Sequence, residues 1–132
     1  MPFTTDAIVV ISHYEIRPGH LRAFQAMWDS MVMDFERAKP RTAAYLGYQN
    51  AGGGSLTIIQ VFPDANALDA HFSGADDRTR QAYEHIEPAG WEVYGPAPDE
   101  LLEQLGEAAL AAGVDLLVQP RTLGGFLRTT VR

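Results

Sequence analysis

Two histidines, His13 and His71, occupy positions from which a side chain could serve as a general base. His71 follows Leu68 by three residues and precedes Ala75 by four, so these residues can share one face of a helix. His13 lies near the polar end of an otherwise apolar stretch. Free imidazole titrates at about pH 6.5, so either side chain could accept a proton near neutral pH. The alternatives are a hydrogen-bonded imidazole that locks a helix end, for His71, and a place in a subunit interface, for His13.

Aromatic and long apolar side chains could hold a hydrophobic ligand beside such a base. Phe24, Trp28 and Met31 recur at spacings of four and three along a predicted helix. Tyr83 and Trp91 add polar tips that could orient a hydroxyl or carbonyl group. Apolar pockets with a few polar groups are the usual sites for small molecules. We therefore predict that these residues bind substrate, with ordinary core packing as the alternative.

Metal and cofactor chemistry finds no support in the sequence. The chain has no cysteine, which excludes disulfides, thiolate metal sites and a cysteine nucleophile. No two of the four histidines are spaced i, i+4, and no acid-rich cluster surrounds one of them. The glycine-rich segment Ala51–Ser55 lacks the lysine and the following helix of a phosphate loop, so it is predicted to be a hairpin turn. We predict no metal site and no bound cofactor.

The composition predicts a soluble, cytoplasmic protein of a single domain. A length of 132 residues suits one domain, which at this size can bury enough surface to fold without disulfides or metals. The formal net charge of −7 argues against binding to nucleic acids or to acidic membranes. No window approaches the roughly 18–20 apolar residues of a membrane span. The N-terminal residues also lack the pattern of a signal peptide.

Hydrophobic periodicity and turn residues divide the chain into alternating strands and helices. The predicted elements are a strand over Ala7–Ile16, a helix over His20–Lys39, strands over Thr42–Asn50 and Leu56–Phe62, helices over Ala65–Phe72 and Asp76–His85, and a strand over Trp91–Tyr94. With the two consecutive helices counted as one helical unit, their order is β-α-β-β-α-β, which is that of the ferredoxin-like fold. This predicts an α+β protein with a four-stranded antiparallel sheet and helices on one face.

The strand Leu56–Phe62 is apolar on both faces, which predicts cover on both sides. Leu56 and Ile58 point one way, whereas Ile59 and Val61 point the other. A sheet face exposed to water would instead alternate with polar residues. Helices can cover only one face of a ferredoxin-like sheet, so we predict a homodimer in which two sheets pack face to face.

A C-terminal extension follows the βαββαβ unit. We assign residues 1–98 to that unit and residues 99–132 to an extension of the same domain. The extension is predicted to contain a helix over Asp99–Ala112, capped by Gly113, and a strand over Val114–Val118. It could cover an edge strand or reach a partner subunit. The arginines of its tail could be solvated or could meet an acidic surface of that partner; they are Arg121, Arg128 and Arg132.

Three motifs resemble the antibiotic biosynthesis monooxygenase family of the dimeric α/β-barrel superfamily. The first is Ile-Arg-Pro-Gly-His at Ile16–His20, ahead of a long helix. The second is the strand-to-helix join Gln60–Phe72, which reads QVFPDANALDAHF. The third is a closing strand that begins near an aromatic residue, Trp91. The resemblance covers roughly Ile8–Tyr94.

The resemblance implies a homodimer with a pocket in each subunit, between the helices and the sheet. Relatives of this kind oxidise aromatic polyketides with molecular oxygen and without metal or flavin, while the protein supplies a base, hydrogen-bond donors and a dry cavity. The expected function is that of a cofactor-independent monooxygenase acting on an aromatic or polyketide-like molecule. An isomerase or cyclase on the same barrel, and a non-enzymatic ligand-binding or stress-related dimer, are the alternatives.

Two catalytic sets known in this superfamily do not transfer to the sequence. The asparagine–tryptophan–arginine set lacks its tryptophan, because the matching helix position holds His71 or Phe72. The haem-degrading set would require an asparagine where Ser12 stands and a histidine at a matching position of the second helix, and neither is found. Haem degradation is therefore disfavoured.

Overall fold

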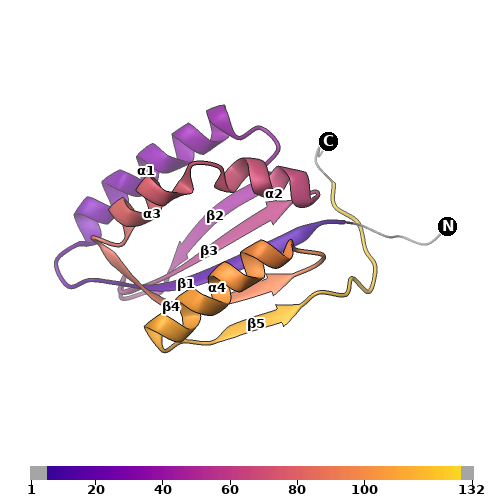
Figure 1. The fold of residues 1–132 in the computed structure, drawn as a ribbon. Coiled ribbons are helices and arrows are strands. Elements are labelled where there is room, and N and C mark those ends of the chain that lie inside the picture. Colours follow the sequence, from indigo (N-terminus) through magenta and orange to yellow (C-terminus); the bar gives the residue numbers. More distant parts are fainter. Residues whose placement is uncertain (1–5, 129–132) are drawn as a thin grey trace.

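Residues 6–128, which the computed structural model describes, form a five-stranded sheet with helices packed on one face (Figure 1). The tail residue Arg132 lies outside the described residues. The elements are β1 (Ile8–Ile16), α1 (Leu21–Ala38), β2 (Ala44–Gln49), β3 (Ser55–Phe62), α2 (Ala65–Phe72), α3 (Ala75–Ala82), β4 (Ile86–Tyr94), α4 (Asp99–Ala112) and β5 (Leu116–Gln119). The strand order is β2-β3-β1-β4-β5.

The predicted α+β, ferredoxin-like fold class is confirmed, and the extension adds one strand to it. The pairs β2–β3, β3–β1 and β1–β4 are antiparallel, as predicted. The extension contributes β5, which pairs with the edge strand β4 in parallel, with Trp91 opposite Leu116. α4 covers the predicted residues, and Gly113 ends it in the left-handed conformation with a φ of +70°. The extension therefore covers an edge strand, which was one of its two predicted roles.

Strand β4 is longer than predicted, because Pro88 and Gly90 lie inside it rather than before it. The pairing of β1 with β4 shifts register between His13 and Tyr14, which is the signature of a β-bulge. A bulge can hold a proline that lacks a backbone N–H. Gly90 has a φ of +147°, which disfavours side chains, and a Cβ there would lie 3.4 Å from the backbone oxygen of Asp115. The proline and glycine that suggested a break thus shape a bulged strand.

The two faces of the sheet differ in what covers them. On β3 burial alternates with each residue, so Leu56, Ile58, Gln60 and Phe62 point toward the helices. On β1 the residues that point toward the helices are Ile8, Val10, Ser12, Tyr14 and Ile16. The row that begins with Val9 faces away from the helices. The sequence left this choice open, since both rows start apolar.

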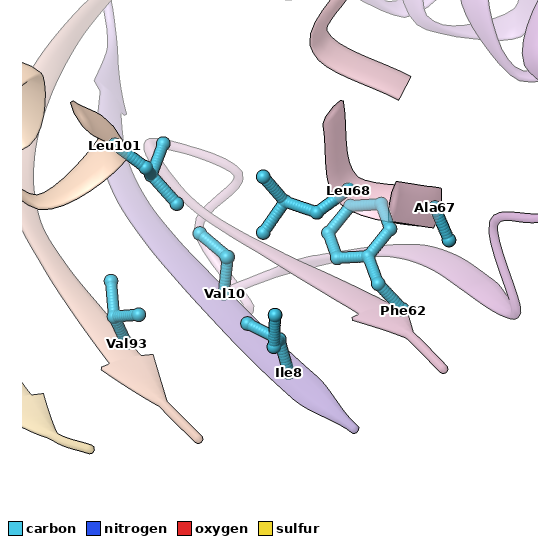
Figure 2. Packing of buried hydrophobic residues seen from close by; sticks show 7 residues of the cluster. All are labelled: Ile8, Val10, Phe62, Ala67, Leu68, Val93 and Leu101. Carbon is cyan, nitrogen blue, oxygen red and sulfur yellow. The ribbon is translucent and has the colours of Figure 1, made fainter. Parts of the chain in front are cut away.

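Two separate hydrophobic clusters hold the helices to the inner face. Figure 2 shows the first cluster, in which side chains from three strands meet Leu68 of α2 and Leu101 of α4. Its members are Ile8, Val10, Phe62, Ala67, Leu68, Val93 and Leu101. The second cluster sits at the other end of β1 and is made of Ile16, Phe24, Leu56, Ile58 and Ile86. Between them, β1 carries the smaller or polar residues Ser12 and Tyr14.

Helix α2 follows β3 at the predicted residues, and Asp64 is the N-cap of this helix. One carboxylate oxygen of Asp64 accepts a hydrogen bond from the backbone N–H of Ala67 at 2.8 Å. The other accepts one from Arg41 at 2.6 Å. These bonds, the Arg41 bond foremost, hold the pKa of Asp64 below its usual value. The cap fixes where α2 starts and therefore which of its side chains face inward.

Helix α1 approaches β2 closely at Gly47. The indole ring of Trp28 lies directly over this glycine and stacks on Tyr45, with ring centroids 5.0 Å apart and an interplanar angle of 18°. A Cβ added at Gly47 would lie 2.7 Å from Cη2 of Trp28 and closer still to Cζ2. The absence of a side chain at this position is therefore what allows the ring to pack.

We expect Gly47→Ala to destabilise the protein by roughly 1–3 kcal/mol, because the new methyl group displaces a rigid ring from a packed site. Gly52→Ala is the matched control, since a Cβ at Gly52 meets nothing within 4 Å. Urea unfolding of both variants measures the difference. Equal stability of Gly47→Ala and the control would contradict the close contact between Trp28 and the sheet.

Candidate functional site

A cavity of about 450 Å³ lies between the inner face of the sheet and all four described helices. It occupies the space between the two hydrophobic clusters. Its floor consists of strand residues on the inner face: Val10, Ser12, Tyr14, Tyr45, Ile58, Gln60, Ile86 and Trp91. A volume of this size accommodates a small organic molecule.

One wall of the cavity is built by α4. Leu101, Gln104, Leu105 and Ala108 of this helix line it, at spacings of three and four residues. From the sequence we predicted that the extension covers an edge strand or reaches a partner subunit, and its contribution to a cavity wall was not predicted. The apolar stripe along α4 was the available signal, but the sequence does not tell which partner surface such a stripe meets.

The predicted ligand-binding residues divide into those that line the cavity and one that does not. Phe24 and Met31 of α1, Tyr83 after α3 and Trp91 of β4 all line it. Trp28 does not, because its ring packs over Gly47 and Tyr45. Its assignment to the substrate site is therefore corrected to a packing role.

His13 lies on the face of the sheet opposite the cavity, which corrects its assignment as a catalytic base of this site. Its Nδ1 is 3.1 Å from Oγ1 of Thr57, and its Nε2 is 2.6 Å from Oε2 of Glu92. Both partners belong to the outer rows of β3 and β4. Strand alternation separates His13 from the cavity, since its neighbours Ser12 and Tyr14 point inward.

His71 does reach the cavity, at the end of α2, where it is only 2 % exposed. Its Nδ1 shares a hydrogen bond with Oγ1 of Thr42 at 2.7 Å. Burial lowers the pKa of His71 to about 4, and the positive charges of Arg78 and Lys39 add to the effect. The imidazole is therefore neutral at pH 7.

A neutral His71 is available as a base but is a weak one. A phenol of ordinary acidity has a pKa of about 10, so moving its proton to an imidazole with a pKa near 4 would cost roughly 8 kcal/mol. The ring also packs against aromatic neighbours, with centroids 4.7 Å from Phe35 and 5.2 Å from Phe62. These features favour the alternative role, in which a hydrogen-bonded imidazole fixes the end of α2.

The polar part of the cavity floor is a group of neutral hydrogen-bond donors. The hydroxyl of Tyr14 interacts with the side chains of Trp91, Ser12 and Tyr83. The ring of Tyr14 lies 6.4 Å from Trp91 in an edge-on arrangement and 6.1 Å from Tyr83. Burial raises the pKa of Tyr14, Tyr83 and Tyr45 above its usual value. These hydroxyls therefore stay protonated and can donate to a ligand oxygen.

Arg78 of α3 brings a positive charge to the cavity lining. Its guanidinium donates to the backbone oxygen of His71 at 3.0 Å and lies 4.7 Å from the centre of the Phe35 ring. The sequence predicted a helix over Asp76–His85, but Arg78 was assigned no role in the site. The signal was present, because the lining residues of α3 recur at helical spacing: Ala75, Arg78, Thr79 and Ala82.

The described part of the chain contains neither a metal-ligand cluster nor a membrane-spanning helix. Among residues 6–128, no group of three or more histidine or acidic side chains is placed to hold a metal ion. His20 and His85 meet as a pair, with their Nδ1 atoms 3.0 Å apart. No helix in this range is long and apolar enough to cross a membrane.

Comparison with known proteins gives matches of structure only. No protein-family model matches the sequence, and neither does any curated protein. MupZ from Pseudomonas fluorescens superposes with a TM-score of 0.70 at 20% identity, over 96% of this chain and 98% of that one. A chain from Caulobacter crescentus, proposed to be an antibiotic biosynthesis monooxygenase, superposes with a TM-score of 0.59 at 12% sequence identity, over 69% of this chain and 90% of that one. SnoaB, a cofactor-independent oxygenase from Streptomyces nogalater, superposes with a TM-score of 0.56 at 13% sequence identity, over 67% of this chain and 90% of that one.

The chain has the fold of the antibiotic biosynthesis monooxygenases. At these identities the likeness establishes the fold alone. The matches to SnoaB and to the Caulobacter chain cover about two thirds of this chain, as expected if they share its βαββαβ unit. The match to MupZ covers nearly all of both chains, so it includes the C-terminal extension, whose helix α4 lines the cavity. The predicted resemblance to this monooxygenase fold is thus confirmed.

We expect the free energy of unfolding to fall as the pH drops from about 6.5 to about 4 through His71. An unfolded imidazole titrates at about 6.5, whereas burial lowers the pKa of folded His71 to about 4. Between these values the unfolded chain binds the additional proton, so acid favours unfolding, by up to roughly 3 kcal/mol. His71→Gln cannot titrate and should lose less stability over this range. Urea unfolding of both proteins at several pH values tests this, and identical pH dependence would refute it.

Proposed function

We propose that the chain is a cofactor-independent monooxygenase that binds an aromatic or polyketide-like hydrophobic molecule in its cavity. The observation that supports this most is the cavity itself, which combines aromatic walls with a floor of neutral donors at Tyr14, Tyr83 and Trp91. A non-enzymatic module with a filled core would have no such space. The fold shared with SnoaB, a cofactor-independent oxygenase, adds support for the reaction class.

The proposed reaction converts an activated methylene group of the substrate into a carbonyl group. The substrate loses a proton and becomes an oxygen-stabilised anion, which donates electrons to O2, and a new carbon–oxygen bond forms. Breakage of the oxygen–oxygen bond then leaves a carbonyl and releases water. One oxygen atom ends in the product and the other in water, together with the two methylene hydrogens, so no external reductant is consumed.

The protein's contribution is to stabilise the substrate anion rather than to supply a strong base. Hydrogen bonds from Tyr14, Tyr83 and Trp91 and the positive charge of Arg78 all favour negative charge on a bound oxygen. They lower the pKa of the bound substrate, which makes proton loss easier even though His71 is weakly basic. The residues of α4 line one side of the cavity and limit the contact of water with the reacting anion there.

The proposal includes a homodimer formed through the outer face of the sheet. This face carries Ile11, Ile59 and Val61, and no element within residues 6–128 covers it. Leu46 is 45% exposed there and Leu117 is 46% exposed. A contiguous apolar sheet face is typical of a subunit interface, and a second copy supplies a matching surface.

Replacing a donor hydroxyl should slow oxygen consumption. With an anthrone-type substrate, we expect Tyr83→Phe to lower kcat/KM by about tenfold or more, because a donor to the developing oxyanion is lost. Tyr48→Phe is the control, since Tyr48 lies on the outer face and is 55% exposed. Oxygen-electrode measurements, with product analysis in ¹⁸O2, report turnover and the source of the new oxygen.

The same assay separates the alternative functions. Turnover that persists without oxygen would replace the monooxygenase by an isomerase or cyclase using the same donors. Ligand binding, seen as quenching of tryptophan fluorescence, with no turnover in either atmosphere would favour a non-enzymatic binding protein. Equal rates for Tyr83→Phe and Tyr48→Phe would remove Tyr83 from the mechanism.

Charging the outer face should dissociate the dimer. We expect Leu46→Glu to raise the dissociation constant roughly tenfold or more, because a carboxylate would be buried in an apolar interface. Leu110→Glu is the matched control, since Leu110 lies on α4 and is 85% exposed. Light scattering over a range of protein concentrations measures the mass. A wild-type protein that stays monomeric would contradict the proposed interface.

A further inference from the structure

Gln60 is a buried amide on an otherwise apolar part of the inner sheet face. It lies on β3 between Ile58 and Phe62, and it pairs across the strands with Val10 and Tyr45. Its exposed fraction is only 7%, and its side chain lines the cavity. The sequence analysis included it only as part of a motif. Its surroundings make a glutamine unexpected at this place.

The amide oxygen of Gln60 has no hydrogen-bond partner. Among residues 6–128, Oε1 of Gln60 is the one buried side-chain oxygen or nitrogen that lacks one. Other buried polar groups near the cavity are paired, such as His71 with Thr42. A buried acceptor without a donor reduces folding stability, and an aliphatic side chain of similar size would avoid that cost. A structural role therefore does not account for Gln60.

The chemistry of the amide suits a ligand hydroxyl. The terminal torsion of glutamine is broad and roughly two-fold, so either the oxygen or the NH2 group can turn toward the cavity. A hydroxyl both donates and accepts, so it can pair with the amide in either orientation. A methyl ether lacks the proton and cannot satisfy Oε1.

The position of Gln60 also indicates the shape of that ligand. Gln60 pairs with Val10, whereas Ser12 pairs with Ile58 and with Trp91. The amide and the donor group around Ser12 are thus one two-residue step apart along the sheet, roughly 7 Å. A ligand touching both would carry oxygen substituents at well-separated positions of a ring system.

We propose that Gln60 is a specificity-determining residue that binds a free hydroxyl group of a multiply oxygenated aromatic ligand. This inference rests on the proposed function, because it concerns the ligand of the same cavity. It narrows the ligand from any hydrophobic aromatic molecule to one that presents a hydroxyl to Gln60 and a second oxygen to the donors at Tyr14 and Trp91.

A matched pair of probes tests the inference by equilibrium binding. The probes are 2,6-dihydroxyanthraquinone and 2,6-dimethoxyanthraquinone, and quenching of tryptophan fluorescence reports binding. We expect Gln60→Leu to weaken binding of the dihydroxy probe roughly 5- to 50-fold, the range for a lost hydrogen bond. Binding of the dimethoxy probe should change by less than about twofold. Gln49→Leu, on the exposed part of β2, is the control and should alter neither affinity.

Unfolding in urea supplies a second test. If Gln60 had a structural role, its replacement would lower the urea concentration at which the protein unfolds. Without ligand, we expect Gln60→Leu to unfold at an equal or higher urea concentration than the wild type, because the unpaired acceptor is gone. Gln60→Met, which is unbranched like glutamine, guards against a packing defect caused by leucine's shape. Unfolding of both variants at clearly lower urea would show that the amide stabilises the fold and would overturn the inference.

The outcomes distinguish failure of this inference from failure of the proposed function. If the wild type binds both probes and the Gln60 variants lose no preference for the hydroxyl form, Gln60 does not determine specificity, while an aromatic-binding cavity stands. If the wild type binds neither probe, the ligand class of the proposed function fails and the inference fails with it.

Discussion

The cavity depends on the separation of two hydrophobic clusters along the inner face of one sheet. Ile8 and Val10 of β1 belong to one cluster and Ile16 belongs to the other. The helices are held at both ends, so the middle of the sheet need not be filled for the fold to be stable. Ser12 and Tyr14 lie in that middle section, where their side chains line the cavity. α4 completes it, because Leu101 joins the first cluster and places the rest of the helix along the cavity.

The sequence predicted the elements of this fold better than their contacts. The boundaries of α2 and α4 follow from local signals, namely the Asp64 cap and the Gly113 stop, which act within a turn of the helix. The length of β4 depends on a bulge against β1, and proline and glycine alone read as a break. Both rows of β1 start apolar, so the face that meets the helices is decided by tertiary packing. For the same reason the placement of His13 outside the site could not be predicted.

The sequence identified His71 as a candidate base because of its residue type, but the folded environment of His71 determines how basic it is. The aromatic rings around His71 remove water, and Arg78 and Lys39 disfavour a further positive charge. The same burial keeps the nearby tyrosines protonated, since an ionised phenol would be equally poorly solvated. The cavity lining combines neutral donors with the cation Arg78 and the acidic residue Asp76, and the donors and Arg78 are suited to stabilising an anion. None of these pKa shifts is visible in the sequence, because each arises mainly from burial, which is set by tertiary packing.

Polar groups on the two faces of the sheet differ in how they are satisfied, and this difference bears on the proposed interface and on the proposed ligand site. On the outer face, both ring nitrogens of His13 are paired, one with Thr57 and one with Glu92, and Glu92 also accepts from Tyr94 at 2.6 Å. Such a self-contained network can be covered by a second copy without leaving an orphaned atom. On the inner face, Gln60 has no partner within the described chain for its oxygen. No residue among 6–128 supplies that partner, and the cavity that Gln60 lines is where a ligand could supply it.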